Sequence, residues 1–134
     1  MKPERKIATF NVQRILEGHP PRTNVNVAAV DGEYTIRIAR VTGTFPAHHH
    51  DGDEAWYIQS GGLRIDSDLG TVELHAGEGA LVPAGAIHSP TCLQEGTTVV
   101  VFHRKGFATI PVDAAALDAS GYREFDGVPI EGAL

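Results

Sequence analysis

Residues 43–54 of this chain have the sequence GTFPAHHHDGDE, with three consecutive histidines ahead of a turn and a glutamate. In an extended segment, residues two apart point to the same face, so His48 and His50 can lie side by side. Neutral imidazoles are good ligands for Fe, Ni, Cu or Zn. Glu54 follows the tight Asp51–Gly52 connection at the start of a predicted strand. Its carboxylate can therefore return to the same pocket, and the stretch predicts part of a metal site.

A second stretch, residues 77–88, has the sequence GEGALVPAGAIH. Its glycines and its proline predict sharp turns on either side of a short strand, and His88 follows the second turn. Each stretch alone has an ordinary explanation, because adjacent histidines can form a solvated loop and a single histidine can end a turn-rich one. Together they predict His88 as a fourth ligand, contributed by a separate strand.

The two stretches resemble the paired motifs of the cupin superfamily, one built on His-x-His with a glutamate and one on Pro-x-Gly with a histidine. The matching residues are His48, His50, Glu54 and Gly61 in the first motif and Gly77, Pro83, Gly85 and His88 in the second. Two positions depart from the family pattern. Gly43 lies one residue closer to His48 than is usual, and Cys92 stands where the second motif often has asparagine.

The resemblance covers residues 25–103 and implies an all-β fold, a double-stranded β-helix (jelly-roll) barrel with a metal ion in its lumen. It also implies a homodimer. The expected cofactor is one divalent ion per chain, Fe, Mn, Ni or Zn, held by His48, His50, Glu54 and His88. The resemblance extends equally to cupin dioxygenases, isomerases, decarboxylases and oxidases with these four ligands, so fold and metal leave the reaction open.

The composition is that of a soluble, single-domain protein: 134 residues, 42% hydrophobic and 21% charged. A net charge of −6 argues against a nucleic-acid or anionic-membrane partner, since either needs a basic face. No apolar run approaches the roughly 20 residues of a membrane span, and the first residues do not resemble a signal peptide. Cys92 is the single cysteine, which favours a reducing compartment, and we expect a cytoplasmic protein.

Short apolar runs alternate with glycine, proline and Asp-Gly signals along the middle of the chain, as in a many-stranded β domain. The predicted strands are residues 25–30, 34–41, 54–59, 63–66, 71–75, 80–82 and 97–102. We predict an N-terminal arm over 1–24, the barrel over 25–106 and a C-terminal extension over 107–134. The arm and the extension each contain a short helix, over 9–17 (capped by Thr9 or Asn11) and over 112–119. The extension can pack on its own barrel or on a neighbouring subunit.

Four residues are candidates for the substrate pocket: Trp56, Ile58, Cys92 and His103. Trp56 and Ile58 share the strand phase of Glu54, although Trp56 fits an ordinary core equally well. Cys92 shares a face with His88. Three roles are open for its thiol: a metal ligand, a redox-sensitive neighbour of the metal, or a small apolar side chain that fills space. His103 either lines the pocket or has a structural role. On the strand over 34–41, Arg37 and Arg40 point to opposite faces. Each is a candidate either for binding an anionic substrate or for a solvated position on the surface.

This ligand set predicts a metal-dependent enzyme that acts on a small polar organic molecule. Glu54 is the candidate catalytic residue, as a ligand first and a proton acceptor second. No further carboxylate or lysine clearly projects into the lumen, which favours dioxygenase-like chemistry over an isomerase that needs a separate base. The alternative is a non-catalytic module that binds or senses a metabolite or a metal. A third, weaker possibility is a barrel in which the metal only stabilises the fold.

Overall fold

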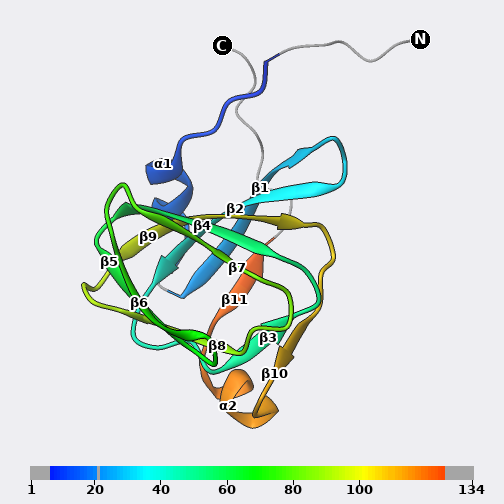
Figure 1. The fold of residues 1–134 in the computed structure, drawn as a ribbon. Helices are drawn as coiled ribbons and strands as arrows, with labels where there is room; N and C mark the ends of the chain where they lie inside the picture. Colours follow the sequence, from blue (N-terminus) through cyan, green and yellow to red (C-terminus); the bar gives the residue numbers. More distant parts are fainter. Residues whose placement is uncertain (1–6, 21, 126–134) are drawn as a thin grey trace.

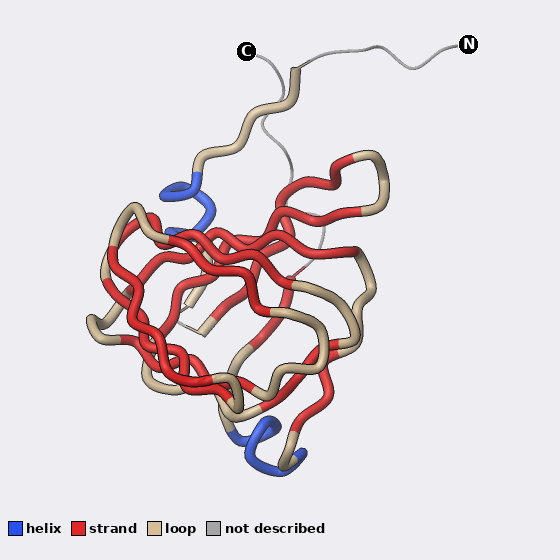
Figure 2. The backbone as a smooth tube through the Cα atoms, viewed as in Figure 1, coloured by secondary structure: helices blue, strands red, loops and turns tan. Residues whose placement is uncertain are grey.

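The computed structural model describes residues 7–20 and 22–125, and within them the chain folds into two β-sheets with two short helices (Figures 1 and 2). One sheet has six strands in the order β11-β1-β2-β9-β4-β7, and the other has five in the order β10-β3-β8-β5-β6. The strands are β1 Thr23–Val30, β2 Tyr34–Val41, β3 His48–His50, β4 Glu54–Ser60, β5 Gly62–Ser67, β6 Gly70–His75, β7 Gly79–Val82, β8 His88–Cys92, β9 Thr97–Arg104, β10 Thr109–Pro111 and β11 Arg123–Phe125. The predicted all-β jelly-roll class is confirmed.

The β1–β2 hairpin shows how local chemistry sets the sheet. The turn residues Asp31 and Gly32 have φ angles of 55° and 67°, the left-handed values that a tight hairpin turn with the twist of the strands requires. In β2 the alternating residues face the barrel interior and the outside of the sheet in turn. β2 then pairs with β9 along its whole length, from Tyr34 opposite Arg104 to Val41 opposite Thr97.

Two apolar clusters hold the fold together. The inner cluster lies between the sheets and joins residues such as Ile58 and Val99 of the six-stranded sheet to Leu63 and Ile65 of the five-stranded one. The outer cluster packs Leu16 of helix α1 (Val12–Glu17) against Val25 and Val27 of β1 and Ile38 of β2. The barrel interior is therefore apolar at the inner cluster, and the polar site described below borders it.

Both helices begin at a side-chain cap. Asn11 caps α1 by accepting a hydrogen bond from the backbone N–H of Arg14 at 3.0 Å, so of the two predicted caps Asn11 is the one used. Asp113 caps α2 (Ala114–Ala119) through the N–H groups of Ala115 and Ala116. No helix in the described parts of the chain is long and apolar enough to cross a membrane.

The segment after residue 106 contributes a strand to each sheet. β10 pairs antiparallel with β3, and β11 pairs parallel with β1. These three-residue strands had no recognisable pattern in the sequence, because period two needs about four residues to be seen. Of the predicted N-terminal arm and C-terminal extension, residues 1–6, 21 and 126–134 lie outside the described part of the structure.

Candidate metal centre

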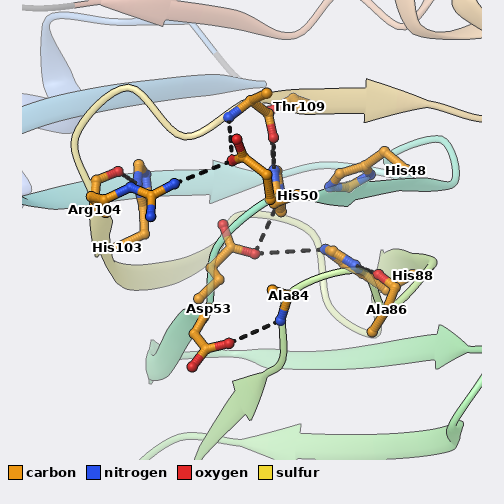
Figure 3. A network of polar contacts seen from close by, with 12 residues as sticks. His48, His50, Asp53, Ala84, Ala86, His88, His103, Arg104 and Thr109 are labelled. Carbon is orange, nitrogen blue, oxygen red and sulfur yellow. Dashed lines mark hydrogen bonds and ion pairs between the residues drawn. The ribbon is translucent and has the colours of Figure 1, made fainter.

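Three histidines from two neighbouring strands meet inside the barrel. His48 and His50 lie on β3 and His88 lies on β8, directly opposite His48 in the strand pairing. One ligand atom from each ring lies within 4.8 Å of the others. The three side chains are buried, with exposed fractions of 4%, 5% and 1%. Figure 3 shows them gathered in one place. The alternation expected for an extended segment thus brings together the residues that the sequence paired.

Backbone carbonyls orient all three rings. The Nδ1 atoms of His48, His50 and His88 lie 2.8, 3.1 and 2.8 Å from the carbonyl oxygens of Pro46, Ala108 and Ala86, respectively. A carbonyl oxygen only accepts, so each Nδ1 carries the proton and donates it. In the neutral form of each ring the lone pair is then on Nε2. A hydrogen bond from the far nitrogen of the ring to a carbonyl fixes the tautomer of a metal-binding histidine in this way.

Glu54, the first residue of β4, brings a carboxylate to the cluster. Its Oε1 lies 3.6 Å from Nε2 of His50 and 3.6 Å from Nε2 of His88. Glu54 is 5% exposed, and neither its Oε1 nor Nε2 of His88 has a hydrogen-bond partner among the described residues. Buried polar atoms without partners are costly unless an ion satisfies them. Three imidazoles and one carboxylate are also a donor set that suits a borderline divalent metal, so these residues fit such an ion.

Burial and the carboxylate set the charge states of the cluster. Burial lowers the pKa of His48 to about 4 and also lowers the pKa of His50, which keeps both rings neutral at pH 7. Burial opposes the charged forms of Glu54 and His88, but their mutual attraction prevails. The pKa of Glu54 is lowered and the pKa of His88 is raised as a result. The site therefore holds a carboxylate and at least two neutral imidazoles.

An aromatic stack supports His50 from the side. Phe107 lies between His50 and His103, with ring centroids 4.1 Å and 3.7 Å away and interplanar angles of 7° and 6°. His103 donates through Nδ1 to the carbonyl of Arg104 at 2.7 Å. Figure 3 shows His103 apart from the three clustered histidines. Phe107 precedes the two short strands at the end of the chain, and nothing in the sequence marked it as part of the site.

A cavity of about 360 Å³ opens from the cluster, within the size range of small-molecule sites. Of the predicted pocket residues, Trp56 lines it. Ile58 is fully buried in the inner cluster instead, and neither Cys92 nor His103 is among the described residues that line the cavity. The lining residues are Asn24, Arg37, Ala39, Val41, Phe45, His48, His50, Glu54, Trp56, Pro90, Val99, Val101, Thr109, Leu117, Asp118 and Tyr122.

Cys92 is engaged elsewhere. Its Sγ accepts a hydrogen bond from the backbone N–H of Gly43 at 3.1 Å, and the thiol donates to Glu95 at 3.2 Å. Burial and the Glu95 carboxylate raise the pKa of the thiol. The sulfur therefore joins the segment ahead of the histidines to the end of β8.

Comparison with known proteins places the barrel in a family. Residues 34–103 match the family model described as Cupin domain. The chain is 30% identical over 89 residues to the uncharacterized protein YdbB of Bacillus subtilis, covering 65% of this chain and 78% of that protein. It is 33% identical over 121 residues to the transcriptional regulator GfcR of Methanospirillum hungatei, covering 85% of this chain and 54% of that protein.

Solved structures share the same barrel. A cupin-2 domain containing protein from Shewanella frigidimarina superposes with a TM-score of 0.65 at 23% identity, over 72% of this chain and 94% of that chain. Hydroquinone 1,2-dioxygenase from Sphingomonas sp. TTNP3 gives 0.63 at 19% identity, over 90% of this chain and 81% of that chain. These likenesses show the fold. With more than half of its residues matched by the family model and a two-sheet barrel to go with them, this chain belongs to the cupin superfamily.

Proposed function

We propose that this cupin is a metal-dependent enzyme acting on a small polar organic molecule, with dioxygenase-like chemistry. One divalent ion, Fe, Mn, Ni or Zn, would be held by His48, His50, Glu54 and His88. The observation that carries the proposal is the convergence of three buried, carbonyl-oriented imidazoles at the cavity wall, with an unpartnered carboxylate oxygen 3.6 Å from two of them. When bound, the ion supplies Lewis acidity and open coordination positions for a substrate or dioxygen.

The protein side chains have separable roles in this proposal. The Nε2 lone pairs of the three histidines face inward because Nδ1 of each ring is committed to a carbonyl. Glu54 lowers the net charge of the site and can accept a proton from a bound substrate. Trp56, on the same face of β4, provides a wall against which the substrate packs and excludes water.

The acidic and basic side chains that line the cavity favour an oxygenase over an isomerase. Among the described lining residues, the only carboxylate besides Glu54 is Asp118 of α2, which is exposed, and no lysine is present. An isomerase needs a placed group to move protons between carbons. An oxygenase relies more on the metal.

Metal content is the first test. Untagged wild-type protein and the variants His48→Ala and His88→Ala are analysed for metals after reconstitution, with exposed His75→Ala as the matched control. We expect about one ion per chain in the wild type and in His75→Ala, and loss of the ion in both cluster variants. Oxygen consumption with Fe(II) then tests the reaction class. A wild type that binds no metal would contradict the proposal.

A binding module without turnover is the second candidate. The similarity to the transcriptional regulator GfcR favours it, although this chain spans only 54% of that protein. Saturable binding of a small molecule by the metal-loaded protein, with no product and no oxygen consumption, would support a sensor over an enzyme.

We also propose that the protein is a homodimer that pairs through the outer face of the six-stranded sheet. Phe102 of β9 and Leu81 of β7 flank Ala55 in one cross-strand row, with exposed fractions of 38% and 64% for the two large residues. Tyr34 stacks on Phe102 at 5.4 Å, and Tyr57 is half-exposed nearby. Sedimentation should give a dimer for the wild type and a monomer for Leu81→Glu, whereas a monomeric wild type would reject the pairing.

A further inference from the structure

Trp56 carries a buried polar atom that the metal centre itself does not use. Its ring lines the cavity and the residue is 9% exposed. Its indole Nε1 is buried and has no hydrogen-bond partner among the described residues. An indole N–H only donates, so a metal ion cannot satisfy it. A buried donor without a partner is costly, and an acceptor for it has to come from a neighbouring side chain.

Glu54 offers a matching acceptor on the same strand. Glu54 and Trp56 are two residues apart on β4, so both point to the inner face of the six-stranded sheet. Both also approach the ring of His88. Oε1 of Glu54 lies 3.6 Å from its Nε2, and the Trp56 ring meets it at an interplanar angle of 77°, with centroids 6.1 Å apart. The two side chains therefore converge beside one imidazole.

The charge state of Glu54 reflects its contact with the indole. Burial, the largest influence, raises the pKa of Glu54, but interactions with His88 and His50 outweigh it, and the N–H of Trp56 adds to the lowering. An N–H group lowers the pKa of a carboxyl when it is directed at the ionised form. Oε1 of Glu54 has no hydrogen-bond partner among the described residues, so the carboxylate has acceptor capacity left for this donor.

We propose that Trp56 is a positioning residue of the metal centre, whose indole N–H donates to the carboxylate of Glu54 and holds it toward the three imidazoles. This adds a residue to the proposed centre and rests on that proposed function. Hydrogen bonds from the protein orient a ligating carboxylate and so raise its affinity for the ion. The ring and the N–H of Trp56 then have separate roles, since the ring lines the cavity and the N–H orients Glu54.

The test removes the N–H and keeps the ring. Trp56 is the only tryptophan of the chain, so growth on a tryptophan analogue replaces this residue alone. Benzothienylalanine has sulfur in place of the N–H and nearly the same shape. We expect the zinc dissociation constant to rise about tenfold with this analogue, as is typical when a ligand loses an outer hydrogen bond. Fluorotryptophan keeps the N–H and is the matched control, which should bind zinc as the wild type does.

The same substitution in a Glu54→Ala background separates the hydrogen bond from packing. Three imidazoles remain in that variant, but the carboxylate is absent, so benzothienylalanine should leave its zinc affinity unchanged. An equal loss of affinity with and without Glu54 would show that the ring acts only through its shape, and this would overturn the proposal. Unchanged affinity of the analogue protein with Glu54 present would overturn it as well.

The NMR signal of the indole N–H gives a second readout that needs no metal. The single tryptophan gives one such signal. In metal-free protein this signal should move upfield on Glu54→Ala, because an N–H that donates to a carboxylate resonates downfield. A signal that stays in place would contradict the contact. If the wild type binds no zinc, the metal centre fails, and this signal still decides whether Trp56 donates to Glu54.

Discussion

The carboxylate of Glu54 sits between two imidazoles, with one oxygen 3.6 Å from Nε2 of His50 and from Nε2 of His88. Glu54 is 5% exposed. A buried carboxylate keeps its charge in such surroundings only if cations are close to it. The carboxylate therefore stays paired with the histidine cluster, whether or not a metal ion is bound. Removing its charge while keeping its shape tests this directly.

Glu54→Gln should weaken metal binding without unfolding the protein. The amide keeps the volume of the side chain but cannot offset the charge of a divalent ion, so we expect the dissociation constant to rise by about 100-fold. Competition with a chromophoric chelator measures the constant. His75→Ala should bind as the wild type does. If Glu54→Gln also binds metal with wild-type affinity, Glu54 is not a ligand.

The connection between β4 and β5 depends on one glycine. Gly61 has a φ of +88°, and a β-carbon there would overlap the hydroxyl oxygen of Thr97. That hydroxyl is itself buried and contacts both the N–H and the carbonyl of Gly62, at 3.1 and 2.9 Å. The turn therefore joins β4, β5 and the start of β9 in one tightly packed contact. This packing explains the glycine at the end of the first motif.

Gly61→Ala should lower the free energy of unfolding by about 3 kcal/mol, from the combined cost of a left-handed backbone and of overlap with Thr97. Gly85→Ala is the matched control, because Gly85 has a φ of +84° but nothing within 4 Å of its added β-carbon. It should cost only about 1 kcal/mol. Urea titrations of both variants measure the difference, and equal losses would show that the contact with Thr97 is unimportant.

The link between α2 and β11 is anchored to the barrel by Tyr122. Its hydroxyl donates to the carbonyl of Thr42 at 3.0 Å, and the N–H of Thr42 lies 3.3 Å from the same oxygen. The ring contacts Phe45 at 4.7 Å between centroids. Burial raises the pKa of this phenol above its ordinary value of 10.0. The anchor therefore depends on a protonated tyrosine.

Stability should fall as the pH rises above 10.0. In the unfolded chain Tyr122 ionises at its ordinary pKa, whereas in the folded protein it stays protonated to higher pH, so alkali favours the unfolded state. The contribution is complete below pH 10.0 and is lost as the pH approaches the raised pKa. Urea titrations from pH 8 to pH 11 measure it. Tyr122→Phe should reduce this slope, and a slope equal to that of the wild type would contradict the assignment.

Across the molecule, the proposed metal ligands come from both sheets. His48, His50 and His88 belong to the five-stranded sheet, and Glu54 belongs to the six-stranded one. An ion bound to all four would hold the two sheets together at one end, while the inner apolar cluster holds them elsewhere. Ligand binding to the folded state alone raises the stability of the whole barrel.

Metal removal should therefore lower the melting temperature of the protein. At a free zinc concentration 100 times the dissociation constant, binding adds about 2.7 kcal/mol to the free energy of unfolding. Calorimetry with zinc and with excess EDTA measures the shift. His48→Ala should melt at the same temperature under both conditions, since it lacks the complete site. A wild type insensitive to zinc would indicate that the four residues do not bind it.

Local patterns were sufficient to predict most of the barrel and the cluster. Strand period, turn glycines such as Gly32, and the caps of both helices act over a few residues, so they can be recognised in the sequence. The spacing of His48 and His50 places them on one face of any extended strand. Their approach to Glu54 and His88 was predicted from the turns beside those residues together with the resemblance to a family, because spacing alone does not bring distant segments together.

The features of the site that were not predicted depend on pairing between distant segments. Phe107 stacks on His50, and Tyr122 reaches the cavity, because β10 pairs with β3 and β11 pairs with β1, and these three-residue strands have no periodic signal. The alternation of outward and inward positions along β2 is visible in the sequence. The sequence does not show which strands pair with β2, and so which residues lie beside Arg37. The sequence by itself determined most of the strands, their turns and the candidate ligands, since those depend on near neighbours. Only the tertiary structure decided the cavity wall, because a wall consists of side chains from strands far apart in the chain.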